Sequence, residues 1–294
     1  MKKKIFITLI ASVFIISGFN ACVESRETAQ SLKKRFPNAR VSILNDEGKD
    51  LGYMRIHRND TLPTLFFLHS SPSNMSVYNI YYEDTILAQW ANIITADRPG
   101  YGISDAGASE ISVRRQAKKM WRILEQEGYP SPLYIIGSSY GGTVAAKMAM
   151  LKPDKVDGVV LVSASLAPGE ETTYDISHII KYRFFRWFLP PMIMVANDEK
   201  LSHLESLQEM TPLWSKITAP VIMFQGTDDR LIFPENVNFA RRNLINSPFV
   251  EYHMLEDEKH FLQLKYKDFI LERLRHLIQD KSLIKKNMAE ISVE

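Results

Sequence analysis

Short apolar runs and longer amphipathic stretches follow one another along most of the chain. Continuous runs such as Val159-Val160-Leu161-Val162 indicate strands buried on both faces, as in a parallel sheet covered by helices. The stretches between these runs have the spacing of amphipathic helices. The alternation predicts an α/β fold with a mostly parallel, doubly wound sheet flanked by helices. We expect strands over 64–69, 92–97, 133–137, 156–163, 221–225 and 249–255, and helices over 77–90, 112–127, 143–151, 235–243 and 261–279.

Residues 40–45 and 51–58 show a different pattern, in which apolar and polar positions alternate. They flank Asp46-Glu47-Gly48-Lys49, a sequence typical of a tight turn. We therefore expect a hairpin at the N-terminal end of the sheet.

The pentapeptide Gly137-Ser138-Ser139-Tyr140-Gly141 lies between an expected strand and an expected helix. In this context G-x-S-x-G forms a sharp turn that projects a serine, the nucleophile elbow. The residues two before and two after the serine crowd such a turn and must be small. Ser139 has glycine at both positions, whereas Ser138 would have an isoleucine and a tyrosine. We therefore predict that Ser139 is a nucleophile.

A serine nucleophile needs a general base, and the base needs an orienting acid. Asp228 and Asp229 follow the apolar run 219–225, just past the expected carboxyl end of a strand. A carboxylate there can lie beside an elbow formed at the same edge of the sheet. His260 follows the last expected strand and is the candidate base.

Four segments resemble, in order, the motifs of the α/β-hydrolase family, over about residues 40 to 280. His69-Ser70-Ser71-Pro72 is similar to the family's H-G-x-P oxyanion loop, and residues 97–104 to its D-R-x-G-x-G-x-S segment. Residues 137–141 resemble the elbow, and 226–229 the G-x-x-D acid site. The resemblance implies an α/β-hydrolase fold and a triad of Ser139, Asp229 and His260, with Asp229 favoured over Asp228.

The resemblance also implies an oxyanion hole made of two backbone N–H groups, which stabilise the charge of a tetrahedral intermediate. One belongs to Tyr140, and the other to Ser71, with Ser70 as the alternative. Ser70 departs from the family pattern, because a glycine is usual there and serine adds a Cβ where the backbone turns sharply.

Other polar residues have plainer interpretations. We interpret His69 as a residue that orients its loop. Glu170 and Glu171 are a rival acid site, although solvated loop charges explain them as well. No H-E-x-x-H, C-x-x-C, G-x-G-x-x-G or Walker motif indicates a metal or a nucleotide, and the expected chemistry needs no cofactor. We expect packing or surface roles for the histidines at 57, 178, 203, 253 and 276.

Residues 167–216 interrupt the alternation of strands and helices and are rich in aromatic side chains. We interpret this segment as a helical cap over the site; the alternative is a packing insert that touches no substrate. Aromatic rings in the cap would suit an apolar acyl or alcohol group. The expected substrate-binding residues are Phe184, Phe185, Trp187 and Phe188.

The N-terminus has the features of a secretory signal, with Lys2-Lys3-Lys4 followed by the apolar residues 5–19. This run is shorter than the roughly 20 residues that span a bilayer as a helix. It ends in Phe19-Asn20-Ala21-Cys22, which resembles a bacterial lipobox with Cys22 as the lipidated residue, although an aliphatic residue is usual in place of Phe19. The alternatives are a secreted or periplasmic soluble protein and an uncleaved anchor.

We divide the chain into a signal peptide (1–21), a tether (22–38), a hydrolase domain (39–280) with the cap, and a C-terminal tail (281–294). Cleavage after residue 21 would lower the 36 basic residues to 33, against 34 acidic ones. A nearly neutral body without a basic cluster gives no reason to expect nucleic acid. Cys22 is the only cysteine, so the body has no disulfide.

The sequence thus predicts a serine hydrolase that is lipid-anchored in the bacterial cell envelope, on the periplasmic or surface side. The favoured activity is hydrolysis of carboxylic esters through an acyl-enzyme on Ser139, as in a carboxylesterase, and the expected partner is a small-molecule ester or amide substrate. The alternatives are a prolyl-type aminopeptidase, which the oxyanion loop also resembles, an acyltransferase, and a catalytically silent envelope protein that binds ligands. The sequence does not indicate an oligomeric state.

Overall fold

The computed structural model describes residues 28–182, 186–187 and 189–279. In this part of the chain eight strands form one sheet in the order β1-β2-β4-β3-β5-β6-β7-β8. The pairs β1·β2 and β2·β4 are antiparallel, and every other pair is parallel. The strands are β1 (Arg40–Asp46), β2 (Lys49–Ile56), β3 (Thr64–Leu68), β4 (Asn92–Ala96), β5 (Leu133–Ser138), β6 (Gly158–Val162), β7 (Val221–Gly226) and β8 (Val250–Leu255).

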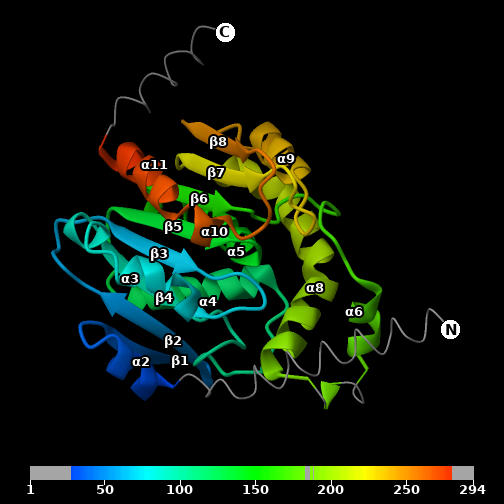
Figure 1. Cartoon of the computed structure of the whole chain (residues 1–294), viewed down its shortest axis with the longest axis horizontal. Coiled ribbons are helices and arrows are strands. Elements are labelled where there is room, and N and C mark those ends of the chain that lie inside the picture. The colour runs from blue at the N-terminus through cyan, green and yellow to red at the C-terminus, as the bar shows by residue number, and fades with distance from the viewer. Residues whose placement is uncertain (1–27, 183–185, 188, 280–294) are drawn as a thin grey trace, which may run out of the picture.

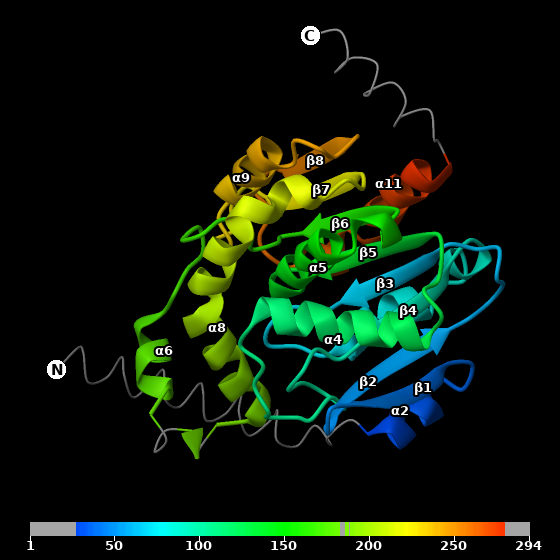
Figure 2. The same cartoon turned by 180° about the vertical axis from the view of Figure 1, so that it is seen from behind.

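Helices cover both faces of the sheet, so the central strands are buried along their whole length. Figure 1 shows α2, α3 and α11 in front of the sheet, and Figure 2 shows α4 and α5 on the opposite face. Each face has its own apolar core. The helices of these layers are α2 (Ala29–Arg35), α3 (Asn79–Tyr82), α4 (Val113–Gln126), α5 (Tyr140–Leu151), α9 (Glu235–Asn243), α10 (Leu262–Lys265) and α11 (Lys267–Gln279).

The predicted doubly wound α/β fold, its strands and its N-terminal hairpin are confirmed. The single helix expected over 77–90 is wrong. The chain instead forms η1 (Met75–Tyr78), α3 and η2 (Leu87–Gln89). The carboxylate of Asp84 accepts hydrogen bonds of 2.8 Å from the N–H groups of Ile86 and Leu87. Such local bonds compete with the helical ladder and end α3.

The segment expected as a tether differs from that expectation in its second half. Residues 29–35 form α2, which begins with a capping box between Thr28 and Ser31. Leu32 and Phe36 lie four residues apart and are buried, and the Phe36 ring contacts the Tyr82 ring edge to face at 5.4 Å. The packed body therefore begins before residue 39.

The cap segment is helical, as expected. It contains α6 (Asp175–Ile180), α8 (Pro191–Met210) and η4 (Thr211–Lys216). In Figure 1 α8 and α6 lie on the right, beyond the carboxyl ends of the parallel strands. None of the described helices is both long enough and apolar enough to cross a membrane.

Candidate active site

Ser139 lies at the turn between β5 and α5, with φ 53° and ψ −123°. A positive φ is uncommon for a residue with a Cβ, and such strain persists only where the surroundings impose it. The Ser139 N–H donates to the carbonyl of Val162 at 2.9 Å, and its carbonyl accepts from the N–H of Gly142 at 2.9 Å. The turn therefore has the backbone of a nucleophile elbow.

The glycines on either side of the turn are needed for close contacts. A Cβ on Gly137 would lie 2.4 Å from the Gly141 carbonyl oxygen. A Cβ on Gly141 would lie 2.3 Å from the carbonyl oxygen of Leu68. This crowding agrees with the motif assignment in which Ser139, and not Ser138, is the central serine of G-x-S-x-G. Ser138 instead ends β5, and its buried hydroxyl has no hydrogen-bond partner in the described part of the chain.

Asp229 and His260 form a buried pair in which Oδ2 of Asp229 is 2.8 Å from Nδ1 of His260. A carboxylate only accepts, so Nδ1 carries the hydrogen and Nε2 is free to accept a proton. The second oxygen, Oδ1, accepts from the N–H groups of Leu231 and Ile232, both at 3.0 Å. Burial alone would raise the pKa of Asp229, but the hydrogen bond and charge of His260 and these two N–H groups outweigh it and lower the pKa.

The segment that carries His260 crosses the carboxyl edge of the sheet. On one side the Asp228 N–H donates to the Glu258 carbonyl at 3.0 Å, which ties the segment to the end of β7. On the other side the Tyr81 hydroxyl donates to the Gln263 carbonyl at 2.7 Å, and the Tyr81 ring packs 5.0 Å from that of Phe67 in β3. Since β5 and β6 lie between β3 and β7, the segment passes over the edge where Ser139 lies.

His69 is fully buried and has both ring nitrogens occupied. Its Nδ1 donates to the Ser70 carbonyl at 2.7 Å, and its Nε2 accepts from the Arg98 N–H at 2.9 Å. Burial, and next the charge of Arg98, lower the pKa of His69 well below its ordinary value. A neutral ring with this bonding holds its loop in place and cannot act as a base.

Ser70 needs no glycine-like backbone, because it is not among the described residues with positive φ. Its carbonyl accepts from Nη2 of Arg98 at 3.1 Å. The Ser71 hydroxyl is 2.8 Å from the Tyr101 hydroxyl. The substitution of serine for the usual glycine therefore leaves the loop anchored through its backbone.

The D-R-x-G-x-G-x-S segment forms a tight loop around Asp97. The Asp97 carboxylate accepts from the N–H groups of Met75 at 2.7 Å and Ile103 at 2.8 Å. Gly102 has φ 48°, and a Cβ there would lie 2.0 Å from Oδ2 of Asp97. The motif thus packs against η1 next to the oxyanion loop and presents Arg98 beneath it.

Glu171, the rival acid, contacts helix α8 instead of His260. Its carboxylate is 3.1 Å from Nδ1 of His203 and 2.7 Å from Nζ of Lys200, both in α8. Burial alone would raise the pKa of Glu171, but these two partners lower it to about 2. The carbonyl of Glu170 accepts from Nδ2 of Asn236 at 2.7 Å. Residues 170 and 171 are thus held against α8 through a side chain and against α9 through the backbone.

Sequence reasoning missed two residues of α8 that touch the site. His203 stacks on the ring of Tyr140 at 4.5 Å, and Nε2 of His203 is 3.2 Å from Oγ1 of Thr143 in α5. Glu199 is fully buried and pairs with Arg98. Neither residue lies in a motif, so the sequence carried no local signal for them.

Of the aromatic residues expected to bind substrate, Trp187 is 89% exposed and its ring faces solvent. Phe184, Phe185 and Phe188 lie outside the described residues, as does Cys22.

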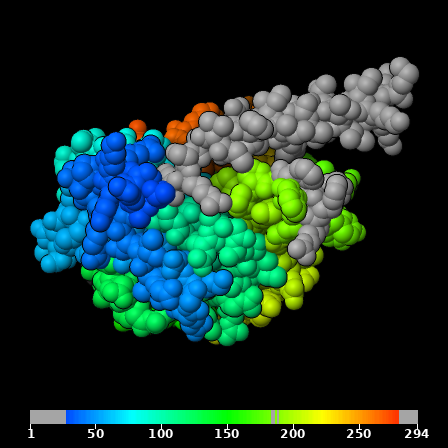
Figure 3. Space-filling view, turned by 90° about the horizontal axis from the view of Figure 1, so that it is seen from below, coloured from blue at the N-terminus to red at the C-terminus, as the bar shows by residue number. Residues whose placement is uncertain are grey.

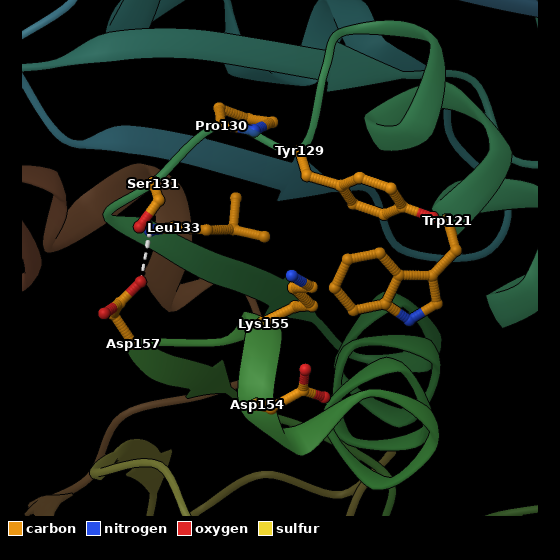
Figure 4. A pocket seen from close by; sticks show the side chains of 8 residues that line it. All are labelled: Trp121, Tyr129, Pro130, Ser131, Leu133, Asp154, Lys155 and Asp157. Carbon is orange, nitrogen blue, oxygen red and sulfur yellow. Dashed lines mark hydrogen bonds between the residues drawn. The ribbon is translucent and has the colours of Figure 1, made fainter.

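No group of three or more His, Cys, Asp or Glu side chains in the described ranges could hold a metal ion. One hollow lies at the amino-terminal edge of the sheet, away from the elbow, between Trp121 and Asp157 (Figure 4). Oδ2 of Asp157 accepts from the Leu133 N–H at 2.7 Å at its rim. It contains none of the candidate catalytic residues.

Comparison with known proteins agrees with the fold described above. A family model described as alpha/beta hydrolase fold matches residues 63–190. The lysophosphatidylserine lipase ABHD12 of Danio rerio is 23% identical over 63% of this chain, and the match spans only 48% of that protein. The mitochondrial palmitoyl-protein thioesterase ABHD10 of Mus musculus is 25% identical over 77% of this chain and 78% of that protein. The crystal structure of a putative lipase from Acinetobacter baumannii AYE superposes with a TM-score of 0.65 at 19% identity, covering 88% of this chain and 97% of that one.

Proposed function

We propose that this protein, which has the α/β-hydrolase fold, is a serine hydrolase that cleaves carboxylic esters through an acyl-enzyme on Ser139. The observation that carries the proposal is the 2.8 Å pair of Asp229 and His260, held at the sheet edge where Ser139 adopts its strained turn. A serine with a neutral imidazole base and a buried orienting carboxylate is a general device for acyl transfer.

In the proposed reaction Oγ of Ser139 attacks the ester carbonyl carbon while Nε2 of His260 takes the hydroxyl proton. Asp229 holds the ring in the correct tautomer and stabilises the imidazolium. The oxyanion accepts hydrogen bonds from the N–H groups of Tyr140 and Ser71. Collapse breaks the bond to the alcohol, which leaves with the proton of His260. Water then repeats the attack, and its proton passes through His260 to Ser139 as the acid is released.

The choice of esters is supported by the relatives, whose names describe a lipase and a thioesterase. Both names refer to the cleavage of an acyl bond to oxygen or sulfur.

The proposal is tested by turnover of p-nitrophenyl esters against aminoacyl anilides, together with labelling by a fluorophosphonate. Ser139→Ala should lower kcat by about 10⁴-fold or more, by analogy with protease triads, and should abolish labelling. Ser138→Ala is the matched control and should retain most activity, because that hydroxyl ends the strand before the elbow. Larger damage from Ser138→Ala would refute the assignment. Faster cleavage of anilides would point to an aminopeptidase, and acyl transfer to an added alcohol would point to a transferase.

We also propose that Cys22 carries a lipid and that this anchor holds the protein at a bacterial membrane. The support is the lipobox-like sequence ending at Cys22. Residues 22 to 28 could span at most about 20 Å when fully extended. Figure 3 shows the start of the described chain, in blue, on the same face as the cap, in yellow-green. Metabolic labelling with a fatty acid should mark the wild type and leave Cys22→Ala unlabelled, and equal labelling of both proteins would contradict the anchor.

A further inference from the structure

A buried ion pair joins the cap to the oxyanion loop. Arg98 and Glu199 are both fully buried, and Oε1 of Glu199 accepts from Nη1 of Arg98. Oε2 of Glu199 is 3.3 Å from Nη2 of Arg98 and accepts from the Tyr101 hydroxyl at 2.6 Å. Nε2 of Gln116 donates to Oε1 of Glu199 at 2.7 Å. A carboxylate with this many donors is held in one orientation.

Arg98 in turn holds the backbone of the oxyanion loop through hydrogen bonds. Its Nε donates to the His69 carbonyl at 2.9 Å, and its Nη2 donates to the Ser70 carbonyl at 3.1 Å. The Ser70 carbonyl and the Ser71 N–H belong to one planar trans peptide, so they point in opposite directions. Anchoring the Ser70 oxygen on Arg98 therefore directs the Ser71 N–H away from the ion pair.

Tyr101 makes a second link to the same residue. Its hydroxyl hydrogen goes to Glu199, because a carboxylate cannot donate. The Ser71 hydroxyl must then donate to the Tyr101 oxygen across their 2.8 Å contact. The Ser71 side chain is thus fixed, and its hydrogen is not available to a substrate.

Arg98 also contacts the side chain of Tyr140, whose N–H is the second candidate donor. Its guanidinium is 4.6 Å from the centre of the Tyr140 ring. Burial alone would lower the pKa of Arg98, but the charge of Glu199 outweighs this and raises the pKa. The ion pair therefore contacts both residues of the proposed oxyanion hole, the loop of Ser71 through its backbone and Tyr140 through its ring.

We propose that Glu199 of the cap is a positioning residue that sets the geometry of the oxyanion hole through Arg98 and Tyr101. This inference rests on the proposed function, since it assigns a role within the same reaction. Glu199 itself touches no reacting atom. It makes the orientation of the Ser71 N–H depend on the placement of α8, so the cap and the hydrolytic site are one unit.

The test compares Glu199→Gln and Tyr101→Phe with Asp198→Asn. Asp198 is the neighbouring residue of α8 and forms its own ion pair with Arg186, at 2.5 and 2.9 Å, without touching the oxyanion loop. Each variant is assayed with p-nitrophenyl acetate and inhibited with an aryl trifluoromethyl ketone. That ketone accepts Oγ of Ser139 at its carbonyl carbon, the serine proton passes to His260, and the resulting oxyanion occupies the hole.

Loss of one oxyanion-hole donor lowers kcat about 10²- to 10³-fold in a well-studied protease. We expect Glu199→Gln to lower kcat by about 10²-fold with KM within about threefold, and Tyr101→Phe by about tenfold. The Ki of the ketone should rise by the same factor as kcat/KM falls, because the inhibitor resembles the transition state. Asp198→Asn should change both constants less than twofold. Active sites are counted by fluorophosphonate labelling, so that kcat refers to folded enzyme.

A different set of results would overturn the inference. If Glu199→Gln lowers stability while kcat per labelled site and the ketone Ki stay at wild-type values, Glu199 only fastens the cap. If Glu199→Gln does not fold, Tyr101→Phe decides, and an unchanged Ki there refutes the role. Failure of the wild type to turn over any ester would instead refute the proposed function, before any variant is compared.

Discussion

Asp229→Asn is the substitution whose outcome the hydrogen bonds determine most directly. The two side chains have the same shape, but one oxygen becomes an NH₂ group. Oδ1 of Asp229 accepts from the N–H groups of Leu231 and Ile232, and Oδ2 accepts from His260 and Gln225. The single oxygen of an asparagine can accept either from the two backbone N–H groups or from the two side chains, but not from both pairs.

The oxygen of the asparagine should face the backbone, because the opposite orientation would leave two buried N–H groups without an acceptor. Its NH₂ then faces Nδ1 of His260 and Nε2 of Gln225. The imidazole can keep a hydrogen bond only by moving its hydrogen to Nε2, the atom that must accept the Ser139 proton. In a serine protease the same wrong tautomer lowers kcat about 10⁴-fold, or about 5.5 kcal/mol of transition-state stabilisation. We expect a loss of similar size here.

The assay measures kcat and KM on a p-nitrophenyl ester, with thermal unfolding as the folding control. Asp228→Asn is the matched control, because the Asp228 side chain is 37% exposed and pairs with exposed Arg230. Exposed pairs contribute little, so kcat should change less than about twofold. The reasoning fails if Asp229→Asn stays within tenfold of the wild type, or if Asp228→Asn is the more damaging change.

Three further outcomes follow from single contacts. The pKa of Glu171 is about 2 in the folded state, whereas its ordinary value is 4.5. The ionised carboxylate therefore contributes about 3 kcal/mol to the free energy of unfolding above pH 4.5, and this contribution is lost as the pH falls toward 2. Urea unfolding of Glu171→Gln should show that deficit at pH 7 and a smaller one at pH 3, and an equal deficit at both would contradict the ionic role. Gly141→Ala places a Cβ 2.3 Å from the carbonyl oxygen of Leu68. The free energy of unfolding should therefore fall by about 3 kcal/mol, and kcat should drop as well. Wild-type values of both quantities would show that the elbow is not crowded at this position. Trp187→Ala should leave the relative kcat/KM across esters of increasing acyl length within about twofold, because the ring is solvent-exposed, and a changed preference would mean that the ring closes on substrate.

The elements that the sequence predicted well are those with signals between neighbouring residues. Buried strands appear as continuous apolar runs, and α9 matches its predicted range because its ends are marked by Pro234 and a change of pattern. The elbow was also local, since its glycines lie within two residues of Ser139. The pairing of Asp229 and His260 required the sheet order as well, and the resemblance to a known fold supplied that order.

The expectations that differed depended on contacts between distant residues. The helix expected at 77–90 was broken by Asp84, whose carboxylate prefers nearby N–H groups. The helix α2 was missed because only Leu32 and Phe36 mark its buried side, and these pack on rings such as that of Tyr82, 46 residues further along than Phe36. Glu199 and Arg98 are 101 residues apart, so no local pattern could join them.

The inner side of α8 explains why the cap was the hardest segment to interpret. Its buried residues include Asn197, Glu199, His203 and Ser206, so its hydrophobic periodicity is weak. Burying such groups is costly unless each finds a partner. Glu199 finds Arg98, Tyr101 and Gln116, and His203 finds Glu171 and Thr143. A shift of α8 along its axis by one turn would leave a buried charge unpaired. We therefore infer that α8 packs against the rest of the domain in a single position.

That constraint divides the cap into two parts with different freedom to vary. Under the proposed role of Glu199, substitutions on the inner side of α8 should alter the support of the oxyanion hole and therefore lower activity on every substrate alike. The segment before α8 carries exposed side chains such as Tyr174, and nothing in the described contacts fixes this ring to the elbow. Differences in substrate preference between this protein and its relatives should therefore arise before residue 190. Exchange of residues 172–182 with a relative should shift the ester profile, whereas exchange of α8 should lower kcat for all esters together.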